Sequence, residues 1–157
     1  SIASLTGYLS LSDSFSWIAT YPALITFGVA TVLEIAAYYI PWVDNVLDTI
    51  ASPIAVIAGI ILTASVITGI SPLLKWALAI IAGGGVAATI QSFTGIVRAT
   101  SSVTTAGIGN PAVSSIELGS SVLLAVIALL VPVIAFAIVV FLVFFSARFL
   151  FRKLKQN

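Results

Sequence analysis

Charged side chains are scarce in the middle of this 157-residue chain, and they are the first candidates for chemistry. Between residues 49 and 147 the charged residues are Lys75, Arg98 and Glu117. Each lies in or beside an apolar stretch, where an ionised group is costly and usually marks a pathway, a binding site or a buried ion pair. The same reasoning adds Glu34 and the neutral Gln91, which interrupt two other apolar stretches.

Four of these groups are expected to form one polar layer in the cytoplasmic half of a helix bundle. Glu34 lies about seven residues before the end of its apolar stretch, Gln91 seven before Arg98, and Glu117 six after Pro111. At about 1.5 Å per helical residue, Glu34, Gln91 and Glu117 each lie about 10 Å inside the same membrane face, with Arg98 above them. The polar-layer candidates for binding a substrate are therefore Glu34, Gln91, Arg98 and Glu117.

Two interpretations of this layer remain open. In the first, Arg98 neutralises Glu117 or Glu34, and the nearby Ser, Thr and Gln side chains only hold helices together. In the second, the layer lines a half-channel or pocket, and the small, polar loop at 99–110 supplies backbone donors and acceptors. Because one guanidinium cannot neutralise two carboxylates, the second interpretation expects one acid to attract a proton or a cation.

The composition excludes a soluble domain. Hydrophobic residues make up 61% of the chain and charged residues 7%, with a mean hydropathy of +1.25. A membrane-spanning helix needs about 20 apolar residues, so the chain has room for about five. The expected fold class is all-α, a polytopic transmembrane helix bundle in a single domain covering residues 1–157, with the lipid bilayer as its solvent.

The same composition argues against several chemistries. Without Cys or His the chain lacks thiolates and the commonest metal ligand and general base, so we expect no enzyme, no cofactor and no metal site. Asp44 and Asp48 are four residues apart and could hold a hard cation, but two interfacial acidic residues are more often solvated. The glycines at 83–85 lack the Lys and Ser/Thr of a phosphate loop, so they indicate close packing. A net charge of +1 gives no basis for nucleic-acid binding.

Prolines and polar runs divide the chain into its expected elements. Residues 1–21 and the amphipathic stretch at 41–48 are expected to lie in the membrane interface. The polar loop at 99–110 and a basic tail at 148–157 complete the organisation. The five spanning helices are expected at 22–40, 53–68, 72–97, 111–130 and 132–145.

The basic residues predict the orientation. Four of the six, Arg148, Arg152, Lys153 and Lys155, follow the last apolar stretch, which places the C-terminus in the cytoplasm. Lys75, on the opposite side, is outweighed. The stretch at 132–145 is apolar all round and could meet lipid, a second copy of the chain or another membrane protein.

The order of several motifs resembles one family. It is the bacterial integral membrane family called domain-of-unknown-function family 4126, and the similarity covers nearly the whole chain. The resemblance implies a bacterial inner membrane protein and supplies no activity. The motifs are Leu33-Glu34-Ile35, Ile40-Pro41-Trp42-Val43-Asp44-Asn45 with Asp48, Pro53, Ser71-Pro72, the glycines at 83–85, Asn110-Pro111 and Glu117.

This chain departs from the family pattern in two places. Members usually begin with a further apolar segment, and many have His where this chain has Gln91, which argues against a proton relay there. Because no Met occurs, even at position 1, an upstream segment is expected to have been removed or omitted, either a cleaved signal peptide or a leading helix. A leading helix would allow two inverted sets of three helices.

The sequence thus favours translocation or binding of a small solute or ion through the polar layer. The alternative is a non-transporting accessory or assembly subunit of a membrane complex, which the apolar stretch at 132–145 would suit.

Overall fold

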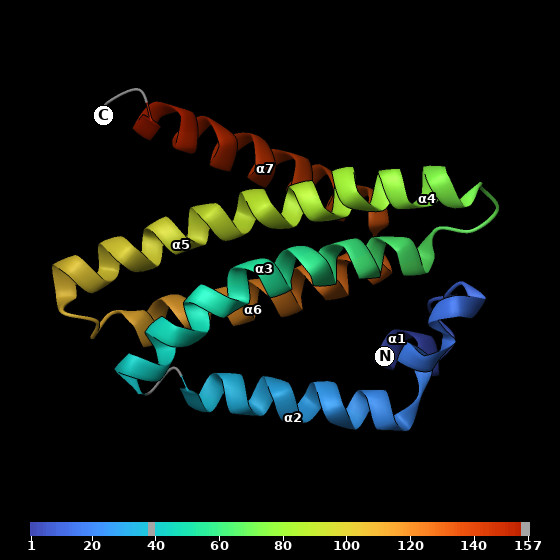
Figure 1. Cartoon of the computed structure of the whole chain (residues 1–157), viewed down its shortest axis with the longest axis horizontal. Helices are drawn as coiled ribbons and strands as arrows, with labels where there is room; N and C mark the ends of the chain where they lie inside the picture. Colours follow the sequence, from blue (N-terminus) through green and yellow to red (C-terminus); the bar gives the residue numbers. More distant parts are fainter. Residues whose placement is uncertain (38–39, 155–157) are drawn as a thin grey trace. The chain divides into compact units, whose positions relative to one another are not determined.

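The structure is a computed structural model that describes residues 1–37 and 40–154. Every regular element in that part of the chain is helical (Figure 1). The chain divides into two compact units, unit 1 (Ser1–Ala87) and unit 2 (Ala88–Asn157), and each is described by itself. The all-helical class expected from the composition is confirmed, whereas the single-domain organisation stays a prediction.

Most of the helices begin where a proline permits it, because proline lacks the N–H that is unpaired in a first helical turn. Proline occupies one of the first two positions of α2, α3, α4, α6 and α7. The elements in chain order are α1 (Ile2–Leu5), the 3₁₀ helix η1 (Asp13–Ala19), α2 (Tyr21–Ala37), α3 (Pro41–Val66), α4 (Pro72–Leu78), the π-helical segment η2 (Ala79–Gly84), α5 (Gly85–Thr105), α6 (Asn110–Leu130) and α7 (Pro132–Leu154).

Four helical stretches in the described residues are long and apolar enough to cross a membrane. The number of candidate spans rises to five if η1 and α2, which meet at a 61° bend, together form one broken span. The expectation of about five spanning helices is therefore met only when this bent pair is included. The four stretches are Thr49–Val66, Pro72–Thr105, Asn110–Leu130 and Val133–Arg152.

In unit 1 the N-terminal segment is held against the α3–α4 hairpin. The backbone N–H of Ser12 donates to the carbonyl of Ser65 at 2.7 Å, and Lys75 Nζ donates to Ser12 Oγ at 2.9 Å. The same ammonium lies 5.1 Å from the centre of the Phe15 ring, a cation–π contact. Lys75, the basic residue that opposed the predicted orientation, therefore has a hydrogen-bond acceptor and an aromatic ring within unit 1.

Small residues form the centre of unit 1. Ala64, Ser65 and Ala79 are almost fully buried, and α3 packs against η2 (Figure 1). A Cβ atom built on Gly59 would lie 2.7 Å from the carbonyl oxygen of Gly83, so the two backbones touch with no room for a side chain. Close approach of this kind is how helices associate in a membrane, where the hydrophobic effect does not drive them together.

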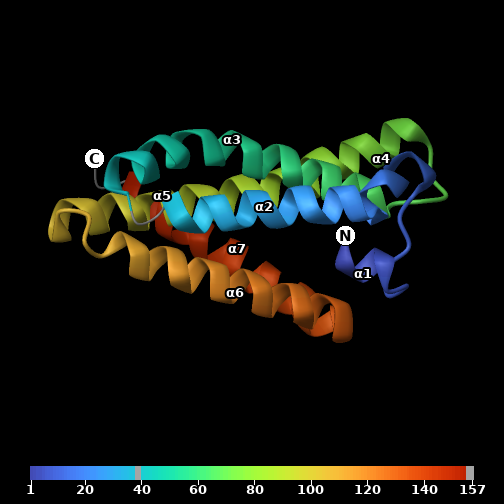
Figure 2. The ribbon, with the colours of Figure 1, turned by 90° about the horizontal axis from the view of Figure 1, so that it is seen from below.

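In unit 2, α5 and α6 form a hairpin that turns at residues 106–109 (Figure 2). Ala106 and Gly107 both have positive φ, and glycine tolerates that conformation without strain. α6 then packs against α7, and Phe93 of α5 meets Phe149 of α7 edge to face with ring centres 5.4 Å apart.

The boundary expected at Pro53 is wrong. The stretch at 41–48, expected to lie separately in the interface, forms the first turns of α3, and Pro53 lies inside that helix. Proline removes one backbone donor, but membrane helices tolerate this because neighbouring groups satisfy the freed carbonyl. The candidate span within α3 still begins at Thr49, after those first turns.

The polar loop expected at 99–110 is largely helical. α5 continues to Thr105, and within it the hydroxyl groups of Thr100, Thr104 and Thr105 donate to carbonyls one turn earlier at 2.7–2.8 Å. The last apolar stretch is also longer than expected, since α7 continues past residue 145 to Leu154. Part of the basic tail is therefore helix.

Candidate functional site

Polar side chains gather between α5 and α6 near the turn of the hairpin, and we call them the α5–α6 polar cluster. Members on one helix are three or four residues apart, so they share one helix face. The cluster consists of Arg98 and Ser102 on α5 and of Asn110, Ser114 and Glu117 on α6.

An ion pair between Arg98 and Glu117 is the centre of the cluster. Nε of Arg98 donates to Oε2 of Glu117 at 3.1 Å, and Nη2 contacts the same oxygen. The Arg98 side chain is 9% exposed and the Glu117 side chain 25%. Because removing an ion from water costs several kcal/mol, a buried guanidinium requires such a partner. The structure thus confirms the expectation that Arg98 contacts one of the two glutamates.

A second contact joins the helices one turn nearer the loop. Nδ2 of Asn110 donates to Oγ of Ser102 at 2.9 Å, and the Ser102 hydroxyl lies 3.3 Å from Oδ1 of Asn110. Asn110 is 5% exposed although it opens a helix at a hairpin turn. Together with the ion pair, this contact holds the polar faces of α5 and α6 toward each other.

Two polar atoms of the cluster have hydrogen-bonding capacity to spare. The Ser114 hydroxyl is buried and has no partner in the described part of the chain, although the residue is only 2% exposed. Ser115 and Ser120 on the same helix instead donate back to carbonyls one turn earlier. Nε and Nη2 of Arg98 both contact Oε2 of Glu117, and no described residue donates to Oε1. The hydroxyl of Ser114 and Oε1 of Glu117 can each form further hydrogen bonds that the described residues do not supply.

The depth expected for Gln91 needs correction. Because α5 ends at Thr105, Arg98 lies seven residues before its end and Glu117 seven after the start of α6, so these two are level. Gln91 lies a further seven residues away, which is about 10 Å at about 1.5 Å per residue. Within unit 2 the layer is therefore Arg98 with Glu117, and Gln91 lies two turns from it.

The remaining candidates belong to unit 1. Glu34 is an exposed residue on α2, so its place in a layer with unit 2 stays a prediction. Asp44 and Asp48 fall in the first turns of α3, but their side chains lie outside the described residues. Among the residues that the structure describes, no group of three or more Asp, Glu, His or Cys side chains could hold a metal ion.

Sequence reasoning missed the contact between Ser102 and Asn110. Ser102 follows Arg98 by one turn, and Asn110 precedes Ser114 by one turn, so both continue polar faces recognisable in the sequence. If the helical spacing of polar residues had been continued through residues 99–110, it would have placed Ser102 and Asn110 on these faces.

The fold and the cluster define a class. Helices that can cross a membrane make up most of the described chain, and the Arg98–Glu117 ion pair is buried between two of them, so this is a multi-pass integral membrane protein. The chain belongs to the family described as Domain of unknown function (DUF4126), whose model matches residues 1–152. No curated protein and no solved structure matches it.

Proposed function

We propose that the protein binds a small polar solute or an ion at the α5–α6 polar cluster and passes it across the membrane. The observation that carries the proposal is the buried Ser114 hydroxyl, which has no partner among the described residues. A purely structural helix contact would favour Ala there or a hydroxyl bonded to its own helix, because an unsatisfied buried polar group costs about 1–3 kcal/mol. The proposal involves no catalytic step.

The ion pair would complete this site. Oε2 of Glu117 is engaged by Arg98, whereas Oε1 has spare capacity, and Glu117 is the more exposed partner. A cation or a hydrogen-bond donor on the solute would therefore approach Oε1, and the Ser114 hydroxyl would supply a second contact. In this proposal Gln91, two turns from the cluster on α5, lines another part of the pathway, and a role for Glu34 stays a prediction from the sequence.

The test is reconstitution in liposomes. Proton, Na⁺ and K⁺ fluxes are compared for the unaltered protein, Glu34→Gln, Glu117→Gln and Ser114→Ala, together with a binding screen of small organic acids, amines and sugars. We expect Ser114→Ala to reduce flux or binding about tenfold, the effect of losing one hydrogen bond to a polar ligand. Because this change leaves the ion pair intact, it tests the site even if Glu117→Gln fails to fold.

Ser115→Ala is the matched control. Ser115 is exposed and its hydroxyl donates to the carbonyl of Pro111 at 2.7 Å, so its loss should leave flux and binding unchanged. No flux and no binding by the unaltered protein, with variants that assemble and support growth normally, would replace transport by the accessory-subunit role. A stable, stoichiometric protein partner after purification in mild detergent would support that alternative.

We further propose that the protein lies in a bacterial inner membrane with its C-terminus in the cytoplasm. The basis is the basic cluster around Arg148 and Arg152 at the end of the last candidate span. A C-terminal fusion should therefore be active with a cytoplasmic reporter and inactive with one that works only outside. The reverse result would overturn the orientation.

A further inference from the structure

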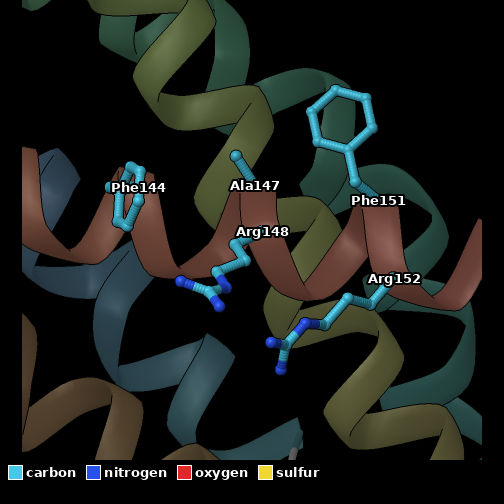
Figure 3. Close-up of a pocket in the computed structure, with 5 residues that line it drawn as sticks. All are labelled: Phe144, Ala147, Arg148, Phe151 and Arg152. Atoms are coloured by element: carbon cyan, nitrogen blue, oxygen red, sulfur yellow. The ribbon is translucent and has the colours of Figure 1, made fainter.

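The last turns of α7 carry an open groove that the polar cluster does not use (Figure 3). Its volume is about 450 Å³, within the range of about 300–1,000 Å³ typical of small-molecule sites. Apart from two guanidinium groups, its lining is apolar. The lining residues are Phe144, Ala147, Arg148, Phe151 and Arg152.

The two arginines form a basic edge. Arg148 and Arg152 are one helical turn apart, and Figure 3 shows their guanidinium groups extending to the same side of α7, whereas Phe151 projects to the other side. Both residues are exposed, and neither contacts a carboxylate in the described part of the chain. The groove thus has two unneutralised positive charges along one edge and aromatic carbon along the other.

The depth of the two arginines along α7 indicates which kind of anion they would bind. The candidate span on α7 is Val133–Arg152, so both arginines lie in its last two turns, at the depth where lipid headgroups meet hydrocarbon. Guanidinium groups bind phosphate oxygens through paired hydrogen bonds, which suits them to a phosphodiester. An apolar wall beside that edge suits an acyl chain.

We propose that this groove holds one anionic phospholipid, with its phosphate between Arg148 and Arg152 and an acyl chain that runs from there past Phe144, one turn deeper in the candidate span. A soluble phosphate would use the basic edge alone and leave the aromatic edge in contact with bulk lipid. The alternative without a site is that both arginines only snorkel to the interface and are attracted to anionic lipid in general. The proposed site binds one lipid molecule and requires arginine. General attraction has no fixed number of lipids and is equally strong with lysine.

Native mass spectrometry of the detergent-purified full chain tests the proposal. Dioleoylphosphatidylglycerol should give one tight adduct, whereas dioleoylphosphatidylcholine, which has no net charge, should bind at least tenfold more weakly. Arg148→Gln with Arg152→Gln should weaken phosphatidylglycerol binding about 30-fold, which is about 2 kcal/mol at about 1.4 kcal/mol per factor of ten. Phe144→Ala, which retains both charges and removes the aromatic ring beside the acyl chain, should weaken it several-fold.

Arg148→Lys with Arg152→Lys is the charge-matched control, because it keeps both charges and loses the paired donors. We expect it to bind phosphatidylglycerol several-fold more weakly than the unaltered protein. Equal binding by this variant would show diffuse attraction and overturn the site. Equal binding of phosphatidylcholine would also overturn it. Displacement of the lipid by glycerol 3-phosphate at the same concentration would do so too, because the ligand would then be a soluble phosphate.

Discussion

Replacing Arg98 with Ala is expected to lower the free energy of unfolding by about 3–5 kcal/mol, the usual cost of removing one partner of a buried ion pair. The loss arises because Glu117 would remain as a largely buried carboxylate without the guanidinium that contacts its Oε2. The measurement is helix content by circular dichroism as SDS is added to protein in mild detergent. Ser115→Ala, on the exposed side of α6, should change the free energy by less than about 0.5 kcal/mol.

A double-mutant cycle separates the pair from the general effect of losing a long side chain. Glu117→Ala combined with Arg98→Ala should be more stable than the sum of the single losses predicts, because the double change leaves neither charge behind. Contacting residues typically couple by about 0.5–3 kcal/mol. Additive losses would show that the two side chains do not stabilise each other, and the site built on them would fail.

The sequence was informative where a property depends on local composition. Apolar runs and prolines locate the spanning stretches because hydrocarbon solvation and the missing proline N–H act over a few residues. The pairing of Arg98 was also predictable, since a lone guanidinium between apolar helices needs a carboxylate and few were available.

Boundaries were less predictable, because the signals for a loop in water differ from those in a membrane. Ser and Thr disfavour helix interiors when their hydroxyls compete for backbone groups. At Thr100, Thr104 and Thr105 the hydroxyls donate to carbonyls one turn earlier and the helix continues. That extension moved Gln91 out of the level of Glu117, so an error in one boundary became an error in the site.

Partners between distant helices could not be predicted from one sequence. The glycines at 83–85 indicated close packing, but nothing in the sequence said that Gly83 meets Gly59. Likewise, Lys75 indicated only a charge on the wrong side, whereas the structure shows it bound by Ser12 and Phe15. Such contacts depend on how helices pack, and several packings satisfy the same pattern of small residues.

The close approach of α3 and η2 leads to a second large expected effect. A Cβ atom on Gly83 would collide with the carbonyl oxygen of Gly59 and with Oγ1 of Thr63. One of these obstacles is backbone, so the two segments would have to separate. Gly83→Ala should therefore lower the free energy of unfolding by about 2 kcal/mol, within the range of about 1–3 kcal/mol for overpacked cores. Detergent unfolding followed by tryptophan fluorescence measures this, since all three tryptophans belong to unit 1.

Two further variants make this result specific to the contact. Gly59→Ala changes the other helix at the same contact. Its Cβ would lie 2.7 Å from the Gly83 carbonyl oxygen and 2.9 Å from Cβ of Ala87, so it should lower the free energy of unfolding by a similar amount. Gly28→Ala is the matched control, because a Cβ there meets nothing within 4 Å and alanine favours a helix over glycine by up to about 1 kcal/mol. The control should be as stable as the unaltered protein or more so. If Gly83→Ala behaved like Gly28→Ala, the backbones of α3 and η2 could not be in contact at these glycines.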